Sequence, residues 1–102
     1  MDDSQLDAMA EKAMHATNML KALGHEGRLM ILCCLVQGER SVTELEVALS
    51  LRQAAVSQQL ARLRADGIIE ARRDGKAIYY SIKDDRAGKI MALIYQLYCG
   101  PG

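Results

Sequence analysis

The sequence contains no phenylalanine, no tryptophan and a single proline among its 102 residues. Half of the residues are nonetheless apolar, so a core must be built from aliphatic side chains, methionine and alanine. Such a composition favours packed helices over a β-sandwich, because strands are enriched in aromatic residues. A chain of this length, 1–102, has room for one compact domain, which would gain stability by burying apolar surface against a second subunit.

The chain also lacks a long apolar run. The longest, Leu29 to Val36, is far shorter than the ~20 residues that span a membrane. The acidic N-terminus has no hydrophobic stretch of the signal-peptide type. Three cysteines in such a chain indicate thiol chemistry or packing rather than a disulfide framework. These features predict a cytoplasmic protein with no membrane partner.

Net charge is absent as well, because 13 basic and 13 acidic side chains cancel. Their distribution is uneven: residues 1–50 hold eight acidic and four basic side chains, whereas residues 51–76 hold six basic and three acidic ones. A basic segment in a neutral protein is sufficient for binding phosphates, since only the contacting face must neutralise them. A solvated helix face would show the same pattern.

Apolar residues at steps of three and four predict a first amphipathic helix from Leu6 to Leu20. A second helix is expected from about Glu26 to Val36, and its continuous apolar run predicts burial on nearly all sides. A last helix at about 85–98, capped by Asp84 or Asp85, carries a broad apolar stripe.

Two capped helices are expected in the middle of the chain. A serine–glutamate capping box at 41–44 opens a short helix over 42–49. A serine–glutamine box at 50–53 opens a longer helix that ends near Asp66. Two helices separated by about three residues predict a helix-turn-helix at about 41–66.

A β-hairpin is predicted directly after these helices. The segments Ile68 to Arg72 and Lys76 to Ile82 alternate partly in polarity and are rich in isoleucine and tyrosine. Arg73-Asp74-Gly75 lies between them and predicts a tight turn, because aspartate and glycine both tolerate positive φ. The expected fold is thus mainly α with a small β-hairpin wing at about 68–82, a winged helix-turn-helix.

The longer middle helix has the composition of a DNA-recognition helix. When Val56 points inward, Leu60 and Leu63 do so as well, and the opposite arc holds small, amide and basic side chains. Alanines allow close approach to the major groove, and glutamine pairs bidentately with adenine. The N-terminal half of such a helix reaches base edges. We therefore predict base contacts from Gln53, Ser57 and Gln58.

Basic side chains in the same region suit contacts with phosphates, which position a protein without reading sequence. Arg52 and Arg62 belong to the recognition helix and its start. Arg72, Arg73 and Lys76 cluster about the hairpin turn, where a basic tip could reach the minor groove or a neighbouring phosphate. The alternative is that the hairpin charges serve only solubility.

Several stretches resemble the ArsR family of metal- and thiol-responsive repressors. They are ALGHEGRLMIL at 22–32, SVTEL at 41–45, QAAVSQQLARLR at 53–64 and RRDGKAIYY at 72–80. The resemblance implies a homodimer, built on the first and last helices, that binds double-stranded DNA at an inverted repeat. It also implies that the DNA is released when an inducer arrives.

The resemblance bears on the inducer too. Metal-sensing members have a Cys-x-Cys pair where this chain has Ser41 and Thr43, and others bind zinc through a last helix that contains histidine, whereas residues 84–98 contain none. No metal or cofactor is therefore predicted. A persulfide-sensing branch has one cysteine in the second helix and one at the end of the last. Those positions match Cys33 and Cys99, which implies reactive sulfur species as the inducer.

Three rival interpretations stay open. In a metalloid sensor, Cys33, Cys34 and Cys99 would supply three thiolates, although adjacent helical residues point about 100° apart. A small thiol-dependent enzyme would need a catalytic partner or nucleophile loop; none is visible, so no enzyme is predicted. A protein-interaction module would keep the fold without binding DNA.

Overall fold

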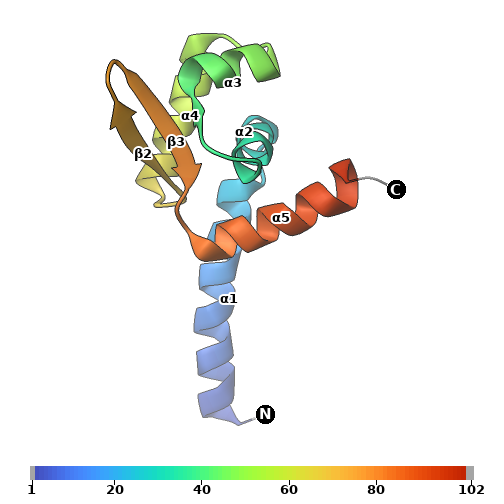
Figure 1. Cartoon of the computed structure of the whole chain (residues 1–102). Helices are drawn as coiled ribbons and strands as arrows, with labels where there is room; N and C mark the ends of the chain where they lie inside the picture. Colours follow the sequence, from blue (N-terminus) through green and yellow to red (C-terminus); the bar gives the residue numbers. More distant parts are fainter. Residues whose placement is uncertain (1, 101–102) are drawn as a thin grey trace.

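A computed structural model describes residues 2–100 of the chain (Figure 1). Helices and a small antiparallel sheet make up the fold, which confirms the predicted mainly α architecture with a hairpin wing. In chain order the elements are α1 (Asp3–Leu23), α2 (Glu26–Val36), β1 (Arg40–Ser41), α3 (Val42–Leu49), α4 (Gln53–Ala65), β2 (Ile69–Asp74), β3 (Ala77–Ile82) and α5 (Asp85–Cys99).

The core lies where α2, α3, α4 and α5 meet the inner face of the sheet. It is aliphatic, with methionine contributed by α5, as the composition predicts. Its largest fully buried side chains are Ile31, Leu32, Leu45, Val56, Leu60, Leu63, Ile68, Ile69 and Met91. The prediction that α2 is buried on nearly all sides is only partly right, because Met30 is exposed and both of its cysteines are half-buried.

The two predicted capping boxes have opposite outcomes. At α3 the box is confirmed: the Glu44 N–H donates to Ser41 Oγ at 3.2 Å, and the Ser41 N–H donates to Glu44 Oε1 at 3.1 Å. At α4 it is wrong, because Arg52 is the N-cap and makes no side-chain cap bond. Ser50 instead ends α3 in a left-handed conformation with φ 54°, which turns the chain from α3 into α4 within three residues.

The hairpin is confirmed, but its turn lies further along the chain than predicted. Asp74 pairs with Ala77, so Gly75 and Lys76 form the turn, and Arg73 and Asp74 belong to β2. Only Gly75 has positive φ there, at 62°, which suits a two-residue turn with glycine first. The sequence did not predict β1, a two-residue strand that pairs with β3 and makes the sheet order β1-β3-β2.

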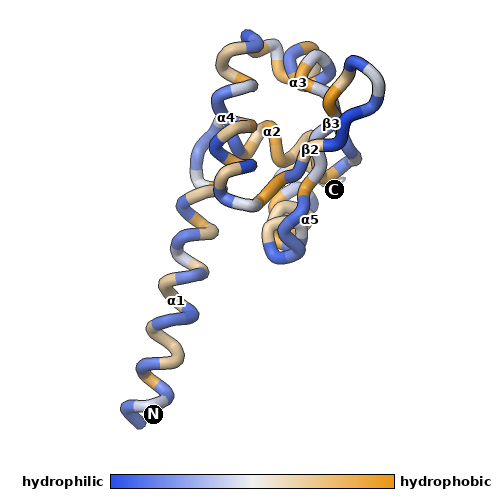
Figure 2. The backbone as a smooth tube through the Cα atoms, turned by 90° about the vertical axis from the view of Figure 1, so that its left-hand side faces the viewer, coloured by the Kyte–Doolittle hydropathy of each residue, from blue (hydrophilic) through white to orange (hydrophobic). Residues whose placement is uncertain are grey.

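Most of α1 extends away from the rest of the molecule (Figures 1 and 2). Of its side chains only Ala22 and Leu23 are buried. The Cα radius of gyration is 15.7 Å, compared with about 13 Å for a compact domain of about 100 residues. No helix within residues 2–100 combines the length and apolarity needed to cross a membrane.

Candidate nucleic-acid interface and cysteine site

The orientation of α4 confirms the predicted division between an inner and an outer face. Val56, Leu60 and Leu63 are at most 1% exposed and hold the helix to the core. The polar and small residues on the other side are all exposed. They include the three residues predicted to read bases and one predicted to contact phosphate: Gln53, Ala54, Ser57, Gln58, Ala61 and Arg62.

A buried arginine connects α4 to the end of α1. Arg28 Nε donates to the carbonyl oxygen of Ala22 at 2.7 Å, and Nη1 donates to Gln59 Oε1 at 3.3 Å. A third donor, Nη2, lies 3.4 Å from the carbonyl oxygen of Lys21. Arg28 therefore satisfies free carbonyls at the C-terminus of α1 and at the same time fixes one side chain of α4. Sequence reasoning missed this role, for which the only signal is an arginine in an otherwise apolar helix.

The N-terminus of α2 is capped by His25. Its Nδ1 accepts hydrogen bonds from the N–H groups of Gly27 at 3.1 Å and Arg28 at 3.3 Å. This use of the ring nitrogen gives His25 a structural role, because it satisfies two donors that have no partner inside the helix.

The arginines offered for phosphate contact differ in their surroundings. Arg62 is exposed, and its Nε lies 3.1 Å from Asp66 Oδ2, one turn further along α4. Arg52 is exposed at the start of the same helix, and Arg73 and Lys76 are exposed at the tip of the wing. The structure thus leaves the predicted residues of α4 exposed to solvent and places two basic side chains at the wing tip.

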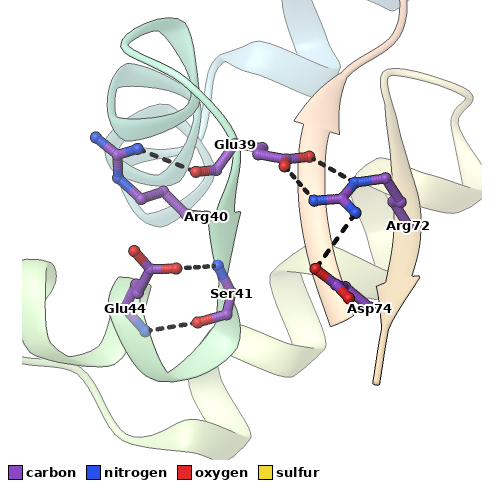
Figure 3. Close-up of polar contacts among 6 residues, drawn as sticks. All are labelled: Glu39, Arg40, Ser41, Glu44, Arg72 and Asp74. Carbon is purple, nitrogen blue, oxygen red and sulfur yellow. Dashed lines mark hydrogen bonds and ion pairs between the residues drawn. The ribbon is translucent and has the colours of Figure 1, made fainter. Parts of the chain in front are cut away.

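Arg72 is engaged by acidic side chains (Figure 3). Its guanidinium donates from both Nε and Nη2 to the carboxylate of Glu39. This guanidinium holds the pKa of the Glu39 carboxyl below its usual range, and the carboxylate in turn raises the pKa of Arg72. Of the basic residues predicted to meet DNA, Arg72 is the one whose guanidinium already donates two hydrogen bonds to a carboxylate among residues 2–100.

The cysteines are divided between two helices that pack against each other, α2 and α5. Cys33 and Cys34 are half-buried on α2, whereas Cys99 is exposed as the last residue of α5, and all three are free thiols. Burial raises the pKa of the Cys33 thiol, and the negative charges that Cys99 and Cys34 can carry raise it further. Cys33 and Cys99 therefore belong to two helices that pack against each other within one chain.

Cys34 has the same half-buried environment as Cys33. Burial also raises the pKa of Cys34, and the charge that offsets this effect is that of Arg40. Across residues 2–100, no three His, Cys, Asp or Glu side chains are grouped in a way that could hold a metal ion.

Two helices joined by a short turn, the second with an exposed polar face, followed by a basic hairpin, define a winged helix-turn-helix, a DNA-binding class of fold. The model of the bacterial regulatory protein arsR family matches residues 25–71. The Biofilm growth-associated repressor of Agrobacterium fabrum is 44% identical over 96 residues, which cover 94% of this chain and 82% of that protein. The chain therefore belongs to the arsR family.

Solved structures agree with this assignment. The transcriptional repressor BigR from Xylella fastidiosa has a TM-score of 0.85 at 41% identity, covering 91% of this chain and 92% of that chain. Reduced HlyU from Vibrio cholerae has a TM-score of 0.87 at 38% identity, covering 90% of this chain and 97% of that chain. The chain is thus a DNA-binding transcriptional regulator and not an enzyme.

Proposed function

We propose that this protein is a cytoplasmic, homodimeric repressor. It binds an inverted-repeat operator through α4 and the wing, and it releases the operator when Cys33 and Cys99 react with a persulfide or polysulfide. The observation that carries DNA binding is the exposed face of α4, where amide, hydroxyl and small side chains stand opposite a fully buried leucine face. Repression is supported by the name of the Agrobacterium fabrum relative.

Each side chain of the interface has a distinct role in this proposal. Base edges are read by Gln53, Ser57 and Gln58, because they lie in the first half of α4 and the neighbouring alanines allow close approach. Phosphates are contacted by Arg52, Arg62, Arg73 and Lys76. Replacing Gln58 by alanine should relax sequence preference at one position of each half-site, whereas Lys76→Gln should weaken binding to all sequences alike.

A homodimer is supported by the uncovered apolar surface of α1 and α5. On α1 the exposed apolar side chains include Leu6, Met9, Met14 and Leu20, and on α5 they include Leu93, Leu97 and Tyr98. Exposed apolar patches of this kind are typical of association surfaces. A second copy of the chain suits both helices, since a twofold interface buries the same patch on each subunit.

Sedimentation of Leu97→Glu tests the dimer. A charge at this exposed position should leave the monomer folded, as judged by circular dichroism, but should prevent association. Glu70→Gln, a charge change on the wing, serves as the control and should sediment like the wild type. A wild-type protein that stays monomeric at high micromolar concentration would contradict the proposal.

The sulfur chemistry follows from two thiols on adjacent helices. Each cysteine, as thiolate, attacks the outer sulfur of a persulfide R–S–SH; an S–S bond breaks, RSH leaves after protonation, and a protein persulfide forms. One protein persulfide then attacks the protein-bound sulfur of the other, which expels H₂S and leaves a trisulfide bridge. Each additional sulfur lengthens a bridge by up to ~2 Å, so a pair too far apart for a disulfide can still be joined.

The bridge is proposed to form within one chain, which is supported by the packing of α2 against α5. It would tie the end of α5 to α2, and both helices pack around the same core as α4. A coupling free energy of ~1–3 kcal/mol between bridge and operator corresponds to a ~5–150-fold change in affinity.

The test is an operator titration with reduced and with persulfide-treated protein. The DNA is a duplex that the wild type selects from a random-sequence library. Treatment should weaken binding by the wild type and by Cys34→Ser, and it should have no effect on Cys33→Ser or Cys99→Ser. Intact mass should show a bridge containing extra sulfur; a plain disulfide would contradict the chemistry. Release of the operator by As(III) in the wild type, but not in Cys34→Ser, would favour the metalloid alternative instead.

A further inference from the structure

Two consecutive arginines of the wing have different environments. Arg72 and Arg73 follow each other in β2, so their side chains point to opposite faces of the sheet. Tyr80, which packs against the core, lies on the same face as Ile78, the partner of Arg73. The face of Arg72 is therefore the one turned away from the core and from α4.

On that outer face the guanidinium of Arg72 is surrounded by partners (Figure 3). The Glu39 carboxylate accepts hydrogen bonds from two N–H groups of Arg72 in a bidentate arrangement. This is the stronger kind of arginine–carboxylate contact. Asp74 Oδ2 lies 3.8 Å from Nη1, and the guanidinium lies 5.2 Å from the ring centroid of Tyr79. A DNA phosphate would have to displace the Glu39 carboxylate from Arg72. It would also be repelled by the negative charges of Glu39 and Asp74, which would stay close to it.

The ion pair joins parts of the sheet that share no main-chain hydrogen bonds. Glu39 directly precedes β1, and Arg72 lies on β2, whereas β3 runs between these two strands. Gly38, with φ 145°, allows the sharp change of direction between α2 and Glu39. The Glu39 side chain therefore reaches across β3 and ties the outer strand of the wing to the loop that follows α2.

We propose that Arg72 is a positioning residue of the wing and that it makes no contact with DNA. Through Glu39 it sets the angle of the hairpin relative to the body, so that Arg73 and Lys76 reach the backbone of the operator. This inference rests on the proposed DNA binding, and it replaces the phosphate contact predicted for Arg72 from the sequence.

Glu39→Gln separates the two roles by the sign of its effect. Loss of an acidic group near DNA tightens binding if Arg72 is a phosphate contact that Glu39 restrains. If the pair positions the wing, the same change weakens binding, by about two- to five-fold per wing, as expected from the strength of exposed ion pairs. Glu70→Gln removes the same charge from β2, where no ion pair among residues 2–100 involves Glu70, and is the matched control.

Two further variants complete the experiment. Arg72→Gln should weaken binding like Glu39→Gln without changing the slope of log K against log salt, whereas Arg73→Gln should reduce the slope by about one per bound wing. The exchange Glu39→Arg with Arg72→Glu keeps the pair and the local charge, so it should bind within about twofold of the wild type. Thermal denaturation establishes that each variant is folded.

The measurements use the duplex selected by the wild type. Tighter binding by Glu39→Gln, a smaller salt slope for Arg72→Gln, or an exchanged pair weaker than both single variants would each overturn the positioning role while leaving DNA binding intact. A wild type that selects and binds no DNA would overturn the proposed function, and this inference with it.

Discussion

Two helices with similar patterns of apolar residues, α4 and α1, have very different surroundings. The inward leucines and valine of α4 are at most 1% exposed, because α2, α3 and the sheet cover them. On α1, Met9 is 49% and Met14 55% exposed, and the helix extends into solvent (Figure 2). An amphipathic period is typical of a helix with one face packed against another element. Other elements of the same chain cover this face of α4, whereas nothing within residues 2–100 covers most of the apolar side chains of α1.

The largest expected effect tests whether the covered region is stable by itself. Leu60→Ala removes a buried side chain from α4 and should cost about 2–5 kcal/mol of unfolding free energy at every protein concentration. Met9→Ala is the matched change in the solvent-exposed part of α1 and should lower stability only at concentrations where the protein associates. Urea unfolding at low and high concentration measures both. A loss of unfolding free energy in Met9→Ala that does not depend on protein concentration would contradict this difference between the two helices.

Arg28 joins the two regions, and its loss should have the next largest effect. Arg28→Met leaves the Ala22 carbonyl and Gln59 without their donor, which should cost about 1.5–3 kcal/mol, as for hydrogen bonds to charged groups. Arg64→Met, at an exposed position of α4, is the control and should stay within about 0.5 kcal/mol of the wild type. Equal losses of unfolding free energy in the two variants, measured by urea unfolding, would show that the buried hydrogen bonds of Arg28 do not stabilise the protein.

The cysteines extend the comparison to reactivity. Because the pKa of Cys33 is raised, its thiolate fraction should grow about tenfold per pH unit through the neutral range and keep growing beyond the pKa of an ordinary thiol. Alkylation of Cys33 by iodoacetamide, followed by mass spectrometry in Cys34→Ser, should show this slope. Cys99 should react faster at neutral pH because it is exposed. A rate for Cys33 that levels off near neutral pH would contradict the raised pKa.

The smallest expected effect concerns the turn between α3 and α4. Ser50 has φ 54°, a conformation that costs residues other than glycine free energy. Ser50→Gly should therefore raise stability by about 0.5–1 kcal/mol, and Ser50→Ala, the control, should not. Thermal melting of the two variants compares them directly. A Ser50→Gly variant less stable than the wild type would mean that the entropy that glycine loses on folding outweighs the relief of backbone strain.

Local patterns predicted most of the elements and the exposed face of α4. They failed where one pattern had two possible uses. Ser41 and Ser50 each begin a serine box, yet only Ser41 caps the N-terminus of a helix, because Ser50 ends α3 in the left-handed turn that leads to α4. The Asp-Gly signal likewise located the hairpin, but the pairing of Asp74 with Ala77 moved the turn by one residue.

By itself, the sequence determined the order of helices and strands, the buried side of α4 and the basic wing, because these depend on periodicity, caps and turn residues close together in the chain. Only the tertiary structure decided the partners of the polar side chains. Glu39 meets Arg72 across 33 positions, and Arg28 meets Gln59 across 31. Such contacts depend on how β1, β3 and the helices are brought together, which no local pattern specifies.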